Sequence, residues 1–384
     1  MNKANDKISP FAGPIYVTRP FLPPLEDFYS GLHEIWSNRW LTNEGPVLRR
    51  FEKKLYDYFQ TENICLFTNG TLALQLGLQG MDIRGEVITS PFTFPATIHT
   101  LYWNKLRPVF SDIEPDTYTL DPDKAEELIT PWTSAILAVH VFGRPCYLER
   151  LQEIADRHNL KLIYDAAHAF GVRINGSNIG TFGDMSMFSF HATKLFHSLE
   201  GGMLVFRDEW LKKTFNYLKN FGFENELEVV MPGTNAKMNE LQALTGDLNF
   251  AYIQEILDKH RLLYDIYKYR LEQVEGLEVP PDFPSWLDPN CSFFPVQVDP
   301  EKFKMGRDGL YYSLREYNVF PRRYFYPLVS DFPCYRSLEI RSGLDTAKRV
   351  SSRILNLPIY YDLSEQDVHK ICDILIFLRS NGLT

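Results

Sequence analysis

The sequence predicts an α/β protein with a mostly parallel central sheet between helices, followed by a smaller α+β segment. Strand and helix signals alternate between residues 63 and 164, the pattern of a parallel sheet covered on both faces. After about residue 251, a long charged helix leads into Pro-rich turns. The 384 residues, 45% of them hydrophobic, suffice for one large core and a smaller one. We therefore expect two domains, residues 1–250 and 251–384.

The elements follow from local patterns. A Pro-rich arm, residues 11–24, should be extended and pack with the C-terminal segment. Two helices are expected at 25–37 and 47–59, with a turn at 40–46 between them. Further along we expect strands at 63–68, 86–90, 108–112, 135–141 and 161–164, and helices at 71–78, 148–158 and 251–274. In such sheets ligands bind beyond the carboxyl ends of the strands, so the chemistry is expected there.

Composition limits the classes of function. The net charge of −9 disfavours binding to nucleic acid, whose phosphates an acidic chain repels. The sequence shows no signal peptide and no apolar stretch of about 20 residues, so we expect no membrane segment. Its five cysteines are scattered without a CxxC pair, which favours reduced thiols in the cytoplasm over disulfides or a metal site. We expect a cytoplasmic protein without a metal.

A carboxylate follows the strand at 161–164, in Asp165-Ala166-Ala167-His168. At the end of a strand, Asp165 could keep the nitrogen of a bound pyridine ring protonated, because an opposite charge favours the charged form. A protonated pyridine is the electron sink of pyridoxal 5'-phosphate (PLP) chemistry. Capping of a following helix is the alternative for Asp165.

A lysine follows a strand-like segment, in Phe188-Ser189-Phe190-His191-Ala192-Thr193-Lys194. A lysine withdrawn from water loses its proton more readily and can form a Schiff base with an aldehyde. Ser189 is placed to donate its hydroxyl to a phosphate. Gly201 and Gly202 allow the backbone to approach closely. A solvated surface position is the alternative for Lys194.

Three further segments fit a cofactor that carries a phosphate. Gly70 and Thr71 stand where a strand turns into a helix, whose free N–H groups bind anions. Phe94 follows another strand and could stack on a flat ring, although Phe92 and Phe94 could both be core residues. Asn235 could donate its amide to phosphate, or cap the helix that follows it.

Together these segments resemble the DegT/DnrJ/EryC1/StrS family of PLP-dependent sugar aminotransferases. The resemblance covers nearly the whole chain, and its specificity comes from the ordered set of motifs. The motifs are Arg19-Pro20, Trp40-Leu41-Thr42-x-x-Gly45-Pro46, Asn69-Gly70-Thr71-x-Ala73-Leu74, Pro91-x-Thr93-Phe94, Val139-His140-x-Phe142-Gly143, Asp165-Ala166-Ala167-His168-Ala169, Ser189-Phe190-His191-x-x-Lys194, Glu200-Gly201-Gly202 and Asn235-x-Lys237-Met238-x-Glu240-Leu241-Gln242-Ala243.

The resemblance implies the fold of PLP-dependent transferases of type I, the aspartate aminotransferase fold, in a homodimer with shared active sites. Lys194 matches the lysine that holds PLP and moves the proton during transfer. Asp165 matches the partner of the ring nitrogen, and His168 a contact of the ring's phenolic oxygen. The remaining cofactor residues implied are Phe94 for stacking, Gly70, Thr71 and Ser189 for the phosphate, and Asn235 for the phosphate of the neighbouring subunit.

The resemblance also implies a reaction. L-Glutamate gives its amino group to PLP, and the resulting pyridoxamine phosphate aminates a ketone of a nucleotide-linked hexose. The opening 19–24 resembles members that aminate C4 of a dTDP-linked 4-keto-6-deoxyglucose. The product would be dTDP-4-amino-4,6-dideoxyglucose, used for a surface polysaccharide such as lipopolysaccharide O-antigen. Many relatives have Tyr-Arg where this chain has Ala236-Lys237, which could alter the pocket floor or the subunit contact.

Contacts to the substrate and rival functions remain open at this point. Candidates for the sugar diphosphate are Arg322, Arg323, His191 and Lys237, and candidates for the nucleotide or sugar are Tyr324 and Tyr326, for which a core role is equally compatible. The same chemistry could act on a 3-keto sugar or a GDP-linked 4-keto sugar. Dehydration is disfavoured because family members with that reaction replace Lys194 with histidine. A catalytically silent regulator is disfavoured by the intact pair Asp165 and Lys194.

Overall fold

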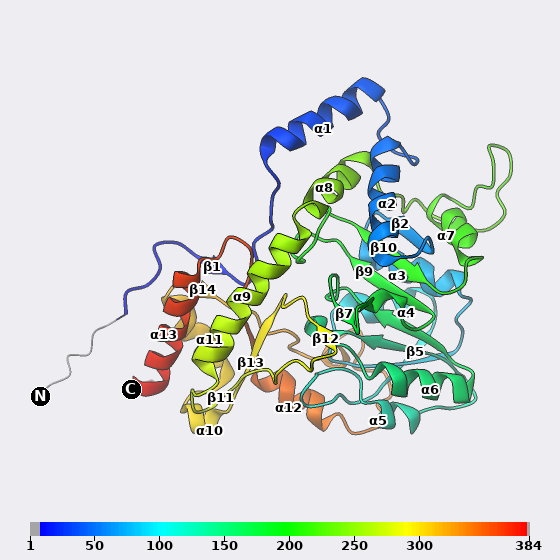
Figure 1. Cartoon of the computed structure of the whole chain (residues 1–384). Helices are drawn as coiled ribbons and strands as arrows, with labels where there is room; N and C mark the ends of the chain where they lie inside the picture. The colour runs from blue at the N-terminus through cyan, green and yellow to red at the C-terminus, as the bar shows by residue number, and fades with distance from the viewer. Residues whose placement is uncertain (1–7, 382–384) are drawn as a thin grey trace, which may run out of the picture.

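A computed structural model describes residues 8–381 and has a seven-stranded sheet at its centre, in the order β2-β10-β9-β6-β5-β3-β4 (Figure 1). The strands are β2 (Ile64–Phe67), β3 (Glu86–Thr89), β4 (Arg107–Phe110), β5 (Thr133–Val139), β6 (Lys161–Asp165), β9 (Met185–Ser189) and β10 (Gly202–Phe206). Only β10 runs antiparallel to its neighbours in this sheet. The carboxyl ends of the other strands therefore meet the start of β10 at one edge, and the predicted α/β class is confirmed.

Helices cover both faces of this sheet because its strands are buried on both sides, as parallel sheets require. Ile163 of β6 packs in the core beneath α3, α4 and α7, whereas Leu162 and Tyr164 pack in the core beneath α6. Towards β2 and β10, the second face is covered by α2 and α8. These helices are α2 (Pro46–Phe59), α3 (Gly70–Gly80), α4 (Pro95–Trp103), α5 (Pro122–Glu126), α6 (Leu148–His158), α7 (Leu211–Lys219) and α8 (Glu240–Phe250).

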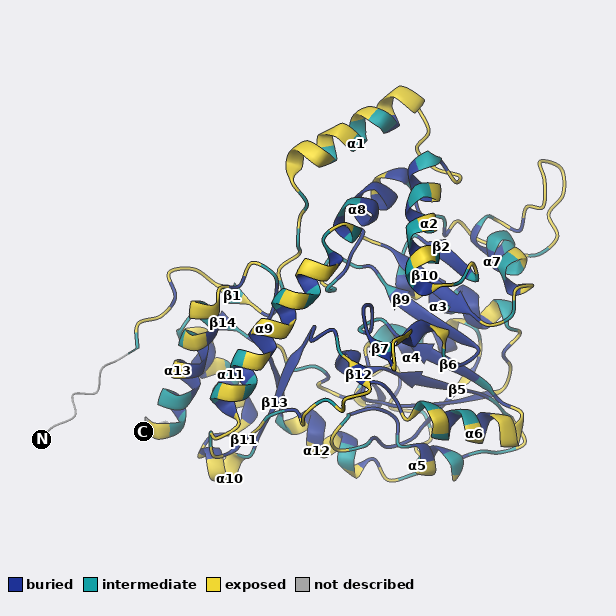
Figure 2. Ribbon diagram, viewed as in Figure 1, coloured by how far each residue is buried: buried dark blue, intermediate teal, exposed yellow. Residues whose placement is uncertain are grey.

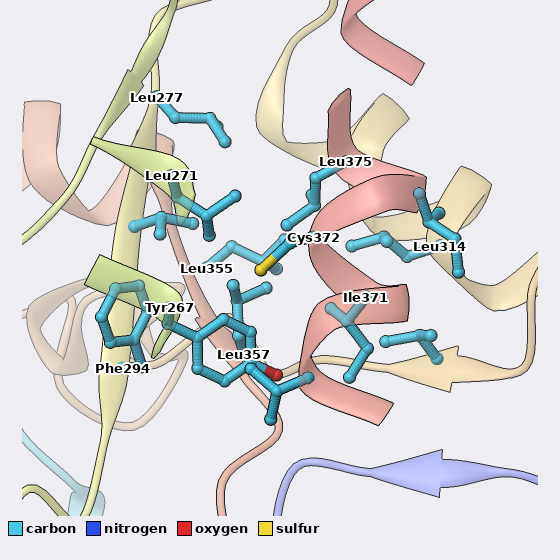
Figure 3. Packing of buried hydrophobic residues seen from close by; sticks show 14 of the residues in the cluster. Tyr267, Leu271, Leu277, Phe294, Leu314, Leu355, Leu357, Ile371, Cys372 and Leu375 are labelled. Atoms are coloured by element: carbon cyan, nitrogen blue, oxygen red, sulfur yellow. The ribbon is translucent and has the colours of Figure 1, made fainter. Parts of the chain in front are cut away.

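The chain after α8 forms a smaller α+β unit. Its three-stranded sheet has the order β11-β13-β15 and is antiparallel. Figure 3 shows its core, where Tyr267, Phe294, Leu357 and Cys372 pack together. The elements are α9 (Ile253–Leu271), β11 (Leu277–Glu278), β13 (Phe294–Val298), α10 (Pro300–Phe303), α11 (Arg307–Glu316), β14 (Val319–Phe320), α12 (Asp345–Arg353), β15 (Ile354–Leu357) and α13 (Glu365–Asn381). Strand β12 (Leu287–Asp288) pairs instead with β7 (Arg173–Ile174), which pairs with β8 (Ser177–Asn178). The division at residue 250 stays a prediction.

The N-terminal arm crosses to this C-terminal unit. Its strand β1 (Ile15–Tyr16) pairs in parallel with β14, and the N–H of Ile359 donates to the carbonyl of Val17 at 3.1 Å. The predicted packing of the arm on the C-terminal segment is therefore confirmed. The next helix, α1 (Leu25–Asn38), is mostly exposed (Figures 1 and 2), but Ile35 is buried in the core beneath α2 and α8, and Glu34 pairs with Arg50 of α2 at 3.1 Å.

Two elements near the edge of the sheet are absent from the sequence prediction. Helix α4 is rich in Thr, Ile and aromatic residues, whose helix propensity is low, so its pattern does not indicate a helix. Strand β10 begins with Gly202, and glycine weakens a strand signal. No helix among the described residues is long and apolar enough to cross a membrane.

Candidate active site

A cavity of about 290 Å³ opens at the carboxyl edge of the large sheet. It collects residues from the ends of β5, β6 and β9, the start of α3, the loop before α4, the N-terminal arm and the C-terminal half of the chain. Seven of the predicted cofactor residues line it: Gly70, Thr71, Phe94, Asp165, His168, Ser189 and Lys194. Segments far apart in sequence therefore converge as the predicted site requires.

Asp165 is the last residue of β6, and only 5% of its surface is exposed. Its Oδ2 accepts a hydrogen bond from Oγ1 of Thr97 at 2.7 Å, and its Oδ1 accepts from the N–H of Ala167 at 3.1 Å. Burial raises the pKa of Asp165, and the Thr97 hydroxyl opposes that rise. Turns follow Asp165 in place of a helix, so the alternative of a helix cap is wrong. A buried carboxylate of this kind fits a cationic ring nitrogen.

Lys194 lies in a turn after β9, where its N–H donates to the carbonyl of His191 at 2.9 Å. Its side chain lines the cavity, which disfavours the alternative of a solvated surface lysine. Burial lowers the pKa of Lys194 to about 8, although Asp165 pulls it in the opposite direction. A much larger fraction of this amine is therefore neutral and nucleophilic near neutral pH than of an ordinary lysine.

The ring of His168 is fixed in one orientation. Its Nδ1 accepts a hydrogen bond from the N–H of Phe142 at 3.2 Å. Burial, together with the charge of Lys194, holds the pKa of His168 well below its usual range. The ring lies parallel to those of Phe142 and Phe325, and its centroid is 4.5 Å from that of Phe293. A neutral ring that accepts at Nδ1 carries its proton on Nε2, where it can donate to an oxygen of a ligand.

The start of α3 provides a place for a phosphate. The side chain of Asn69 caps this helix by accepting from the N–H of Leu72 at 2.8 Å. Gly70 and Thr71 form the first turn, whose N–H groups have no acceptors within the helix and attract anions. The hydroxyl of Ser189 lies at the adjacent end of β9.

Gly202 lets the start of β10 lie directly against the start of α3. A Cβ atom at this position would be 2.5 Å from both the carbonyl carbon and the carbonyl oxygen of Asn69. Real Cβ atoms essentially never approach backbone that closely, so no other residue fits without a backbone shift. The predicted close approach of the backbone at Gly202 is confirmed.

The two phenylalanines of the segment before α4 have different environments. Phe94 is 55% exposed, precedes the first residue of α4 and lines the cavity. Phe92 is fully buried and packs against Tyr118, Phe142 and Phe325. Phe94 is therefore the phenylalanine that a flat ligand can reach, and Phe92 belongs to the core.

Asn235 and Lys237 lie outside this cavity. Asn235 is exposed and forms an isolated bridge with Asn220, and the helix that follows begins only at Glu240, with Asn239 as its cap. The alternative in which Asn235 caps the helix is therefore wrong. Nζ of Lys237 donates to Oδ1 of Asn220 at 2.7 Å. The role of Asn235 across a subunit contact stays a prediction.

Like Lys237, three more of the predicted substrate residues lie outside the cavity. Arg322 exchanges backbone hydrogen bonds with Asn356. Arg323 donates to Oδ1 of Asp308 at 2.9 Å. Tyr326 is 46% exposed, and the guanidinium of Arg307 lies 4.3 Å from the centre of its ring. Their assignment to substrate binding has no support from this geometry.

The other two substrate candidates line the cavity, namely His191 and Tyr324. Nδ1 of His191 accepts from the N–H of Thr193 at 3.1 Å, and its Nε2 lies 3.4 Å from the carboxylate of Glu200. His191 therefore already has an acidic neighbour at the place where a diphosphate would have to compete.

Sequence reasoning missed several residues that line or support the cavity. Thr18 comes from the N-terminal arm, and Phe293 and Phe325 come from the C-terminal half, so only the tertiary fold reveals them. Thr93 and Thr97 stand in a segment that the sequence singled out, but helix α4, which brings Thr97 to Asp165, was not predicted, so their contact with the site was missed.

Residues 25–376 match the DegT/DnrJ/EryC1/StrS aminotransferase family. The chain belongs to this family. It is 42% identical over 379 residues to a dTDP-4-amino-4,6-dideoxy-D-glucose transaminase of Escherichia coli, covering 97% of this chain and 99% of that protein. It is 29% identical over 350 residues to a GDP-perosamine synthase of Vibrio cholerae, covering 89% of this chain and 93% of that protein.

The fold of this chain is similar to that of a solved structure over nearly its whole length. DesI, crystallised in the presence of its TDP-sugar product, superposes with a TM-score of 0.92 at 34% identity, covering 97% of this chain and 95% of DesI. The predicted fold of PLP-dependent sugar aminotransferases is confirmed, and the chain is an aminotransferase.

Proposed function

We propose that this aminotransferase binds PLP and transfers the amino group of L-glutamate to C4 of dTDP-4-dehydro-6-deoxy-D-glucose. The product is dTDP-4-amino-4,6-dideoxy-D-glucose. The observation that carries this proposal is the difference in identity between relatives. The chain is 42% identical to the dTDP-sugar transaminase over 97% of its length, but 29% identical to the GDP-perosamine synthase.

The cavity has the donor set that PLP requires. Lys194 supplies an amine with a pKa of about 8 for the cofactor's aldehyde, and Asp165 supplies a buried carboxylate for its ring nitrogen. Gly70, Thr71 and Ser189 would hold the phosphate. Bound PLP supplies an electron sink, which stabilises negative charge at the carbon that gains or loses the amino group.

Four residues of the cavity would have separate roles in the reaction. Lys194 would accept and return the proton at the reacting carbon, for which a pKa of about 8 is suitable because it lies close to neutral pH. Asp165 would hold the ring nitrogen in its protonated form by charge pairing. His168 would donate from Nε2 to the ring's phenolic oxygen, because the N–H of Phe142 occupies Nδ1. Phe94, which is exposed and lines the cavity, would stack on the ring.

The working unit in this proposal is a cytoplasmic homodimer with shared active sites. Asn235 is exposed and lies outside the cavity of its own chain, which is compatible with a contact to the phosphate in a second copy. His191 and Tyr324 line the cavity and are the candidates for substrate contacts within one chain. The amino sugar would serve a surface polysaccharide such as lipopolysaccharide O-antigen.

The test is a substrate panel. The purified, PLP-loaded enzyme is incubated with L-glutamate and with dTDP-linked 4-keto, dTDP-linked 3-keto and GDP-linked 4-keto 6-deoxyhexoses, and products are identified by NMR. We expect an equatorial amine at C4 of the dTDP sugar, which is the gluco configuration of the proposed product. Amination of only the GDP sugar, or amination at C3, would refute the proposed substrate.

A further inference from the structure

We propose that Thr97 is a positioning residue that holds the Asp165 carboxylate ionised and turned towards the cofactor, with Thr93 holding Thr97 in turn. This inference rests on the proposed function, because it assigns Thr97 a task at the bound cofactor. It concerns the hydroxyl of Thr97 in the first turn of α4 and that of Thr93 just before this helix, neither of which the sequence motifs assigned to the site.

The two threonines and Asp165 form a short, buried chain of hydrogen bonds. Oγ1 of Thr97 lies 2.7 Å from Oδ2 of Asp165, and Oγ1 of Thr93 lies 2.8 Å from Oγ1 of Thr97. Thr97 is fully buried, Thr93 is 2% exposed, and Asp165 is 5% exposed. Thr93 also lines the cavity. The chain therefore runs from the cavity wall through the helix start to the carboxylate.

The direction of this chain follows from counting protons. An ionised carboxylate only accepts hydrogen bonds, so the single hydroxyl proton of Thr97 goes to Asp165. In the contact between the two hydroxyls, Thr97 must then accept and Thr93 must donate. Both hydroxyl donors of this hydrogen-bonded series consequently point towards Asp165 and favour its charged form.

Asp165 needs such donors because burial works against its charge. Burial raises its pKa, and the hydrogen bond from Thr97 is the first of the interactions that lower it. The N–H of Ala167 is the second, and Lys194 is the cationic group that adds to them. The thiol of Cys146 also faces Asp165, but burial raises its pKa, so it stays neutral. Hydrogen bonds to ionised groups are stronger than those between neutral groups, so the bond from Thr97 contributes strongly to keeping Asp165 ionised.

The same contact also sets the position of the ring-stacking candidate. Thr97 lies in the first turn of α4, and Phe94 is the residue that precedes this helix. A bond from Thr97 to the end of β6 therefore fixes the start of α4 relative to Asp165. Two groups proposed to touch the cofactor ring, one at its edge and one at its face, are thus held by one side chain.

A matched control exists one turn along the same helix. Thr100 is fully buried like Thr97, and its hydroxyl donates to the carbonyl of Thr97 at 2.9 Å, without contacting Asp165. Thr100→Val therefore removes an equally buried hydroxyl from α4 but leaves the carboxylate its donor. Thr97→Ser keeps the donor and loses only a methyl group.

The experiment compares binding of two cofactors to the apoenzyme. PLP has the ring nitrogen that Asp165 would pair with, and 1-deazapyridoxal 5'-phosphate lacks it. Thr97→Val should weaken PLP binding about tenfold, the loss typical of one hydrogen bond to a charged group, and change binding of the deaza analogue less than about twofold. Thr97→Ser should stay within about threefold of wild type for both cofactors. Thr100→Val should change neither by more than about twofold.

The outcomes separate a positioning role from a structural one. Equal weakening of both cofactors by Thr97→Val, or no weakening of either, overturns the proposal. If circular dichroism shows that Thr97→Val does not fold, the same two cofactors are compared in Thr93→Val, which removes the hydroxyl that donates to Thr97. Selective loss of PLP in that variant supports the proposal, and unchanged PLP binding overturns it. The glutamate half-reaction of the wild type reports separately on the proposed function.

Discussion

The backbone N–H of Phe142 donates a hydrogen bond to Nδ1 of His168 across 3.2 Å. Because this contact occupies one ring nitrogen, and burial keeps the ring neutral, only Nε2 of His168 can donate to a ligand. The parallel rings of Phe142 and Phe325 hold this orientation. His168 is therefore a fixed, uncharged donor on the cavity wall.

Substitutions at His168 should follow its capacity to donate. His168→Gln keeps an amide donor and should retain the rate of the glutamate half-reaction within about threefold. His168→Leu has no donor and should lower that rate about tenfold or more. Stopped-flow absorbance of the bound cofactor measures both. Equal rates for Gln and Leu would show that donation from His168 has no part in the reaction.

The pKa of Lys194 should be visible in the loading of the apoenzyme. Since the neutral amine attacks the aldehyde, the rate of PLP capture should rise with pH and level off above the pKa of about 8. Below that pH the ammonium predominates and capture slows. The rate is followed by absorbance between about pH 6 and pH 10, where an ordinary lysine would still be mostly protonated. A midpoint near the ordinary lysine value would contradict the buried position of the amine.

The contact between Gly202 and Asn69 should not tolerate a side chain. In Gly202→Ala the new Cβ would lie 2.5 Å from the Asn69 carbonyl, so β10 and the start of α3 must separate. We expect the free energy of unfolding to fall by about 2 kcal/mol, with weaker binding of PLP. Urea unfolding and cofactor titration measure the two effects.

Gly13→Ala is the control, because a Cβ at Gly13 meets nothing within 4 Å. Its free energy of unfolding should stay within about 0.5 kcal/mol of wild type. If Gly202→Ala had the same stability and cofactor affinity as the wild type, β10 and the start of α3 could move apart without a loss of free energy.

Much of the site could be predicted from sequence because its residues stand at the ends of strands. Asp165 and Ser189 end β6 and β9, and Gly70 begins α3, so alternating strand and helix signals already place them at one edge. The arm and the class of fold follow from similar patterns, whereas the local pattern around Lys194 left a surface position open and only the ordered set of motifs indicated its role.

What the sequence could not provide depends on packing between distant segments. Phe293 and Phe325 reach His168 from the C-terminal half, and no local signal marks them. Arg322 and Arg323 have charges suited to a diphosphate, yet the fold places them outside the cavity. Charge in a sequence indicates what a residue can bind, whereas its location depends on the whole chain.

The most direct measurement of the central claim is a map of the lysine that holds the cofactor. The PLP-loaded protein is reduced with borohydride, which converts the labile linkage to a stable secondary amine, and its peptides are identified by mass spectrometry. The account predicts the reduced pyridoxyl group on Lys194, and its loss from that peptide in Lys194→Ala. Modification of a different lysine in the wild type, or of none, would contradict it.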